Sequence, residues 1–193
     1  MTAPARREQL LDVTMELVVE QGFHSASVQA VARRAGVSRP IVYEHFGDLN
    51  GLLEALVARE TASALAEISE STLGDLSKGD PSELMLESLR AYLAAVARHP
   101  MTWRLVLMAP EGAPELLRRS IARGRADVLA SLTDAVRPGS MPGHESPDPE
   151  MTARILSAIA DEYARLVLVD PNRFPPERLL DHARWLLRNL SPQ

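Results

Sequence analysis

Apolar residues recur along this chain at the three- and four-residue spacing of amphipathic helices, and the strict alternation typical of half-buried strands is almost absent. Glycine and proline interrupt the pattern and mark where helices end. The resulting segments predict helices over about 5–21, 50–73, 82–99, 101–108, 113–136, 150–169 and 176–190, together with two short helices between Gly22 and Gly47 that begin after Ser27 and Ser38. We therefore predict an all-α protein of about nine helices, with loops over 74–81 and 137–149.

The stretch between Gly22 and Gly47 contains two short helical segments that meet at Gly36. Glycine commonly follows a helix because it adopts the left-handed conformation without a steric penalty. Each segment is preceded by a serine, Ser27 or Ser38, whose hydroxyl can accept a hydrogen bond from the first helical turn. Two short helices joined by a tight turn are typical of a helix-turn-helix, whose second helix enters the DNA major groove.

The second of these helices has two chemically different faces. Val42 and Phe46 are four residues apart and share the face turned towards the first helix, and Val37 is placed to pack on Val42 as a hydrophobic staple. The opposite face carries Arg39, Pro40, Tyr43 and Glu44. This face suits groove recognition, since arginine donates to guanine edges and apolar groups contact thymine methyls.

Charge supports DNA binding locally rather than over the whole chain. The sequence has 21 basic and 26 acidic side chains, a net charge of −5, which argues against a non-specific polyelectrolyte binder. Between Gln21 and Tyr43, however, there are three arginines, Arg33, Arg34 and Arg39, and no carboxylate. The alternative for Arg33 and Arg34 is that they only solvate a helix end near its negative dipole.

These residues carry a family resemblance. The segment ASVQAVARRAGVSRPIVYEHFGDLNGLLEAL, preceded by ELVVEQGF, resembles the N-terminal domain of the TetR family of transcriptional regulators over roughly residues 8–57. The strongest elements are the Ala-Gly-Val-Ser turn, Tyr43 with His45 and Phe46, and the following leucine pair. The resemblance implies a helix-turn-helix DNA-binding domain over 1–49 and a helical effector-binding and dimerisation domain over 50–193.

The resemblance also implies roles for single residues. Gln29 matches a base-contacting position of the first motif helix, and Val28 matches a position near phosphate. The expected DNA-binding residues are Ser27, Val28, Gln29, Arg33, Ser38, Arg39, Pro40, Tyr43, Glu44 and His45. One departure is Leu49, which stands where family members often carry a phosphate-binding lysine. This departure leaves one phosphate contact in doubt, and the salt dependence of DNA binding would then be shallower by about one unit.

The remaining helices suggest a dimer and an effector pocket. In the family the last two helices pair with those of a second subunit, and the apolar stripes here fit that role or an intramolecular core equally well. The expected interface residues are Ile155, Ile159, Leu166, Leu179, Ala183, Leu186, Leu187 and Leu190. An effector pocket between bundle helices would be lined by Tyr92, Met101, Trp103, Leu107, Met108 and Tyr163, with ordinary core packing as the alternative.

Other classes of protein fit poorly. The chain has no cysteine, which excludes disulfides and thiolate metal sites, and its five histidines lack metal-ligand spacing. A phosphate-binding glycine loop and a nucleophile elbow are both missing, so we expect no enzyme activity, metal or cofactor. The N-terminus runs into an amphipathic segment, and no apolar run approaches the ~18 residues of a membrane span, so we expect a cytoplasmic protein.

The sequence therefore predicts a homodimeric transcriptional regulator, expected to be a repressor. In this interpretation it leaves a pseudo-palindromic double-stranded DNA operator when an unidentified small-molecule effector binds. The alternative is a helical dimeric ligand-carrier or protein-interaction module that no longer binds DNA, an interpretation to which Leu49 and Glu44 point.

Overall fold

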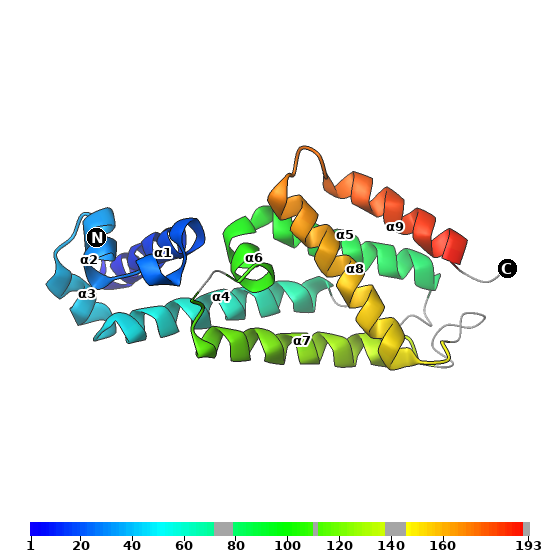
Figure 1. Ribbon diagram of the computed structural model, residues 1–193, viewed down its shortest axis with the longest axis horizontal. Helices are drawn as coiled ribbons and strands as arrows, with labels where there is room; N and C mark the ends of the chain where they lie inside the picture. The colour runs from blue at the N-terminus through cyan, green and yellow to red at the C-terminus, as the bar shows by residue number, and fades with distance from the viewer. Residues whose placement is uncertain (72–78, 110–111, 138–145, 191–193) are drawn as a thin grey trace. The chain divides into compact units, whose positions relative to one another are not determined.

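The computed structural model describes residues 1–71, 79–109, 112–137 and 146–190, and all regular structure in these ranges is helical (Figure 1). The elements are α1 (Ala3–Gln21), the short 3₁₀ helix η1 (Phe23–Ser25), α2 (Val28–Ala35), α3 (Arg39–Phe46), α4 (Leu49–Ser71), α5 (Pro81–Arg98), α6 (Pro100–Leu107), α7 (Glu115–Ala135), α8 (Pro149–Val169) and α9 (Pro176–Leu190). The predicted all-α fold is confirmed, and only η1 was not expected from the sequence.

Helix starts follow from local capping chemistry. The Ser27 hydroxyl accepts a hydrogen bond from the Ala30 N–H at 3.1 Å, as the sequence predicts. The carboxylates of Asp80 and Asp148 cap α5 and α8 in the same way. Ser38 holds the predicted position before α3, but its hydroxyl makes no capping bond. The central parts of the two predicted loops, 72–78 and 138–145, lie outside the described residues.

The chain divides into two compact units. The first contains residues Met1–Ala64 and Met101–Ile121, and the second contains Leu65–Pro100 and Ala122–Gln193. The helices α4 and α7 each contribute residues to both units. The sequence instead predicts a boundary by function, with a DNA-binding domain up to residue 49 and an effector-binding and dimerisation domain from residue 50. This boundary stays a prediction.

The first unit is built around one apolar core. Side chains of α1, η1, α2, α3, α4, α6 and α7 meet there, and Leu105 of α6 and Leu117 of α7 are fully buried together with the helix-turn-helix residues. Its buried members include Leu10, Leu11, Met15, Val18, Phe23, Val31, Ala32, Val42, Leu52, Leu56 and Val57. The motif helices are therefore held against α1 and α4 by a shared core rather than by the turn alone.

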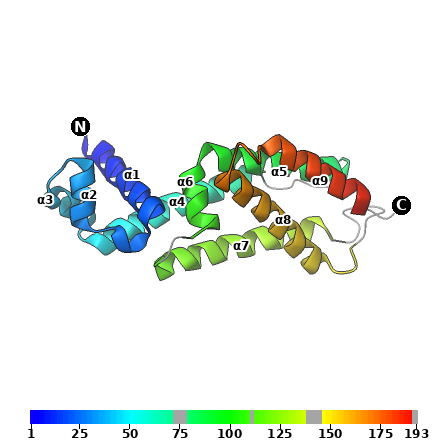
Figure 2. The same cartoon turned by 45° about the horizontal axis from the view of Figure 1, so that its top comes forward.

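In the second unit α5 packs against both α8, which crosses it, and α9 (Figures 1 and 2). Apolar residues of each helix fill the space between them, among them Leu93, Val96, Ala164, Val167, Leu168, Leu179 and Leu180. Among the described helices, none combines the length and apolar composition needed to cross a membrane.

Candidate nucleic-acid interface

The turn between α2 and α3 depends on Gly36. Its φ of 66° and ψ of 35° are left-handed, a conformation that side-chain-bearing residues rarely adopt. The Gly36 N–H donates to the Arg33 carbonyl at 3.3 Å and the Val37 N–H donates to the Ala32 carbonyl at 2.9 Å. This pair of bonds is the Schellman arrangement, which ends α2 and reverses the chain within a few residues.

The two faces of α3 are separated as the sequence predicts. Val42 is fully buried, and Phe46 is partly buried against the same core. On the opposite side Arg39, Pro40 and Glu44 are exposed, and Tyr43 has 49% of its surface exposed. Arg39, Pro40 and Tyr43 therefore present a cationic group and apolar atoms together on the outward face of α3.

The preceding helix adds a smaller exposed strip. Ser27, Gln29 and Arg33 are exposed beside the turn. Val28 differs, because its side chain is 9% exposed and belongs to the core of the first unit. A position of Val28 near phosphate stays a prediction.

The three arginines of the motif have different surroundings. Arg34 donates two hydrogen bonds to the Glu20 carboxylate, at 2.8 and 2.9 Å, and lies 3.1 Å from Glu16. These bonds lower the pKa of the Glu20 carboxyl below its usual range. Arg33 and Arg39 form no ion pair with residues in the described part of the chain. Two of the three exposed arginines, Arg33 and Arg39, therefore remain without an ion pair among the described residues for phosphate or base contacts.

Helix α1 holds both motif helices at their C-terminal ends. The Arg7 guanidinium donates to the His45 carbonyl at 2.9 Å and lies 4.4 Å from the centroid of the Phe46 ring. The Gln9 amide donates a weaker bond to the Ala35 carbonyl at 3.4 Å. These carbonyls lack intrahelical donors, so α1 satisfies them and fixes where α2 and α3 end. The half-buried His45 thus contributes its main chain to the fold.

The junction of α3 and α4 is unusually close. The Asp48 carboxylate accepts a hydrogen bond from the Gly51 N–H at 2.8 Å and caps α4. A Cβ atom on Gly51 would lie 2.1 Å from the Phe46 carbonyl oxygen, so only glycine fits there without movement. Leu49 opens α4 and packs partly buried against the core. The phosphate contact expected to be lost at Leu49 stays a prediction.

The predicted effector residues fall in different surroundings. In the first unit Trp103 is 1% exposed and Leu107 is 9% exposed, while Met101 and Met108 are exposed by 42% and 39%. Trp103 and Leu107 are therefore buried and the two methionines are partly accessible. An effector role for these four residues stays a prediction.

The two tyrosines belong to the second unit and make specific polar contacts. The Tyr92 hydroxyl donates to Asp161 Oδ1 at 3.3 Å, and burial, followed by the Asp161 charge, raises the pKa of Tyr92. The Tyr163 hydroxyl and His182 Nδ1 share a hydrogen bond of 2.7 Å. An effector role for either tyrosine stays a prediction.

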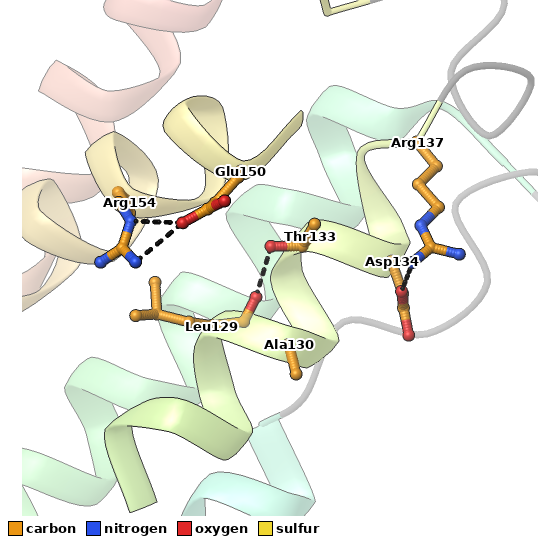
Figure 3. Close-up of a pocket in the computed structure, with 7 residues that line it drawn as sticks. All are labelled: Leu129, Ala130, Thr133, Asp134, Arg137, Glu150 and Arg154. Carbon is orange, nitrogen blue, oxygen red and sulfur yellow. Dashed lines mark hydrogen bonds and ion pairs between the residues drawn. The ribbon is translucent and has the colours of Figure 1, made fainter. Parts of the chain in front are cut away.

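An open pocket of about 290 Å³ lies between α7 and α8 (Figure 3). Its lining residues are Leu129, Ala130, Thr133, Asp134, Arg137, Glu150 and Arg154. The close-up shows both arginines engaged by nearby carboxylates, Arg154 with Glu150 of the same helix at 2.8 Å and Arg137, just after α7, with Asp134 at 3.0 Å. None of the six predicted effector residues lines this pocket. Among the described residues, no group of histidine, aspartate and glutamate is arranged to hold a metal ion.

The predicted dimer residues separate into two groups. Ile155 is 54% exposed, and Ile159, Leu166, Leu186 and Leu187 are partly buried. The side chain of Leu190 lies outside the described residues.

Leu179 and Ala183 are buried at 4% and 7% exposure inside their own unit. This burial agrees with the intramolecular alternative, and an interface role for these two residues stays a prediction. Trp185 of α9 is instead 56% exposed, and its ring stacks on His182 with centroids 5.9 Å apart.

Comparison with known proteins places the helix-turn-helix in a family. Residues 10–56 match the profile described as "Bacterial regulatory proteins, tetR family". The chain is 44% identical over 94 residues to the HTH-type transcriptional regulator BetI of Yersinia pestis (strain Pestoides F), covering 49% of this chain and 43% of that protein. It is 36% identical over 119 residues to BetI of Klebsiella pneumoniae (strain 342), covering 53% and 60% respectively. The chain thus spans about half the length of these relatives.

Solved structures extend the similarity to the whole fold. A TetR-like transcriptional regulator from Rhodococcus sp. RHA1 superposes with a TM-score of 0.75 at 21% identity, with 97% of each chain covered. A putative transcriptional regulator from Pseudomonas aeruginosa PAO1 gives a TM-score of 0.74 at 20% identity, covering 99% of this chain and 92% of that one. At these identities the match establishes the fold. The relatives are named as regulators rather than enzymes, in agreement with the prediction.

Proposed function

We propose that this chain is a regulator of the TetR family and regulates transcription by binding double-stranded DNA through α2 and α3, since residues 10–56 match the profile of that family. The observation that carries this proposal is the outward face of α3. Arg39 is exposed there without an ion-pair partner among the described residues, beside the exposed Tyr43. Such a face combines a donor for guanine edges with apolar contact for a thymine methyl or a sugar.

The proposal includes a homodimer. Exposed apolar residues on α8 and α9 support it: Met151 at 53%, Ile155 at 54%, Val169 at 63% and Trp185 at 56%. A two-fold dimer presents two recognition helices to successive major grooves, ~34–36 Å apart or a multiple of one DNA turn. Its operator would be pseudo-palindromic, because the symmetry of the site follows that of the protein.

The proposal further includes repression that a small molecule relieves. A ligand releases DNA if it binds more tightly to a form of the protein whose recognition helices are wrongly spaced than to the DNA-binding form. The difference between these two affinities sets how far the ligand can shift the population. Helices α4 and α7 belong to both compact units, which supports them as the route between ligand and DNA. The effector itself is not assigned.

The test is selection of binding sites from a randomised DNA library, followed by fluorescence anisotropy with the selected duplex and excess random competitor. Arg39→Ala is expected to weaken binding by about 1–3 kcal/mol and to relax the preference at one base pair. Arg34→Ala is the matched control, because it removes the same charge from the same motif but from a side chain held by Glu16 and Glu20.

Equal losses for the two variants would contradict base recognition by Arg39. Failure to select any duplex with folded wild-type protein would overturn DNA binding altogether. That outcome would favour a helical ligand-carrier or protein-interaction module instead.

A further inference from the structure

A buried carboxylate joins three helices of the first unit. Glu60 of α4 is 5% exposed, and its two oxygens are used separately. Oε1 accepts from the Arg59 guanidinium, with the Nε at 2.8 Å and Nη2 at 2.7 Å, while Oε2 accepts from the Thr102 hydroxyl of α6. Thr102 is itself 8% exposed. An ionised carboxylate is retained in such a place only when both its charge and its lone pairs have partners.

The same guanidinium extends the contact to α1. Arg59 Nη1 lies 2.9 Å from Glu8 Oε2 and 2.8 Å from Asp12 Oδ1, which are one helical turn apart on α1. Arg59 is the cation for three carboxylates, one of them buried. Exposed ion pairs contribute little by themselves, but an arginine fixed by a buried carboxylate presents a guanidinium whose orientation is already set.

Helix α1 then reaches the recognition helix. Arg7, adjacent to Glu8 in the sequence, donates to the His45 carbonyl at the end of α3 and covers the Phe46 ring. A continuous series of contacts therefore runs from Thr102 through Glu60 and Arg59 to α1, and from there to α3. Every residue in this series belongs to the same compact unit.

We propose that Arg59, fixed by Glu60 and through it by Thr102, is a positioning residue that sets α1 and thereby the placement of the recognition helix. A change in the position of α6 is thus transmitted to α3 through this polar link as well as through the shared apolar core. The effect of this link on DNA binding rests on the proposed function, whereas the contacts that form the link are present in the protein without DNA. Arg59 is not assigned a DNA contact.

The experiment is hydrogen–deuterium exchange of the full chain without DNA, comparing wild type with Thr102→Val. Valine keeps the shape of threonine but removes the donor to Glu60, so the carboxylate loses one of its partners. We expect amides of α1 and of residues 39–46 to exchange roughly fivefold faster or more. A fivefold change corresponds to a loss of about 1 kcal/mol in the free energy of local opening. Thr102→Ser, which retains the hydroxyl, is expected to restore the wild-type pattern.

Two controls separate this link from general destabilisation. Thr61→Val makes the same substitution in α4, where the hydroxyl bonds to the Val57 carbonyl of its own helix. Leu105→Val loosens α6 through the apolar core without touching the polar link. If Thr102→Val and Leu105→Val lower the melting temperature similarly and change exchange in the same places, the proposal is overturned.

Arg59→Gln provides the second variant, since it removes the charge at the centre of the link. Faster exchange in α1 and 39–46 supports the proposal, and changes confined to α4 and α6 contradict it. Anisotropy with the selected duplex is a separate arm. Altered exchange in a protein that selects no duplex would refute the proposed function while leaving the link intact, so the two failures are distinguishable.

Discussion

Replacing Gly51 by alanine tests how rigidly the recognition helix is seated on α4. The new Cβ would lie 2.1 Å from the Phe46 carbonyl oxygen, whereas real Cβ contacts essentially never fall below 3.0 Å. The two backbones must therefore separate by about 0.9 Å, the difference between these distances. A carbonyl oxygen cannot rotate away as a flexible side chain does, and it ends a helix that Arg7 also holds through His45.

Two opposing contributions set the size of the effect. Alanine in a helix interior gains up to about 1 kcal/mol over glycine. Forcing atoms into a packed site costs typically about 1–3 kcal/mol, and the high end applies where the obstacle is backbone. We expect a net loss of about 1–2 kcal/mol in the free energy of unfolding, which lowers the melting temperature by roughly 2–8 °C for a chain of this size.

Thermal unfolding followed by circular dichroism measures this change, and Gly124→Ala supplies the control. Gly124 lies inside α7, where the nearest atom to an added Cβ is the Leu65 Cδ2 at 3.4 Å, an ordinary contact. This variant is expected to be more stable than wild type by up to about 1 kcal/mol. If Gly51→Ala were stabilised as Gly124→Ala is, the close seating of α3 on α4 would be refuted.

Two further predictions concern the second unit. Burial and the Asp161 charge raise the pKa of Tyr92 above its ordinary value of 10.0. The stability that Tyr92 contributes is therefore complete below pH 10 and is lost as the pH rises above 10. Urea unfolding measured from pH 8 to 11 should show a smaller decline in stability for Tyr92→Phe than for wild type. Ile155→Lys should convert the proposed dimer to a folded monomer in sedimentation velocity, because the residue is 54% exposed and tolerates lysine in the isolated chain. A dimer that persists with the variant would place the interface elsewhere.

The helix boundaries and the faces of α3 could be predicted because their causes are local. Ser27 and Gly36 act within a few residues of their own position, and the separation of Val42 from Tyr43 follows directly from helical periodicity. These features depend on the chain within one or two turns, so the sequence contains all the information they need.

Contacts between distant residues could not be predicted in the same way. Arg34 was counted in the positive patch of the motif, but it is bound by Glu16 and Glu20, which only the packing of α1 brings near. Glu60 carries a charge that a sequence pattern assigns to the surface, and its burial depends on donors from Arg59 and Thr102.

Helix α9 shows a different limit of sequence reasoning. Its leucines and Ala183 share one side and Trp185 lies on the other, but periodicity could not decide whether the leucine side packs within the chain or against a second subunit.

The capture of Arg34 by α1 has a consequence for how such a protein searches a chromosome. Attraction to arbitrary DNA grows with the number of cations offered to phosphates, and here one of the three motif arginines is already neutralised by its own domain. Under the proposed function, few copies would be held on unrelated sequence, and most would diffuse between DNA segments. Occupancy of the operator would then follow changes in the number of protein copies closely, because only a small fraction of the protein would be bound non-specifically to the chromosome.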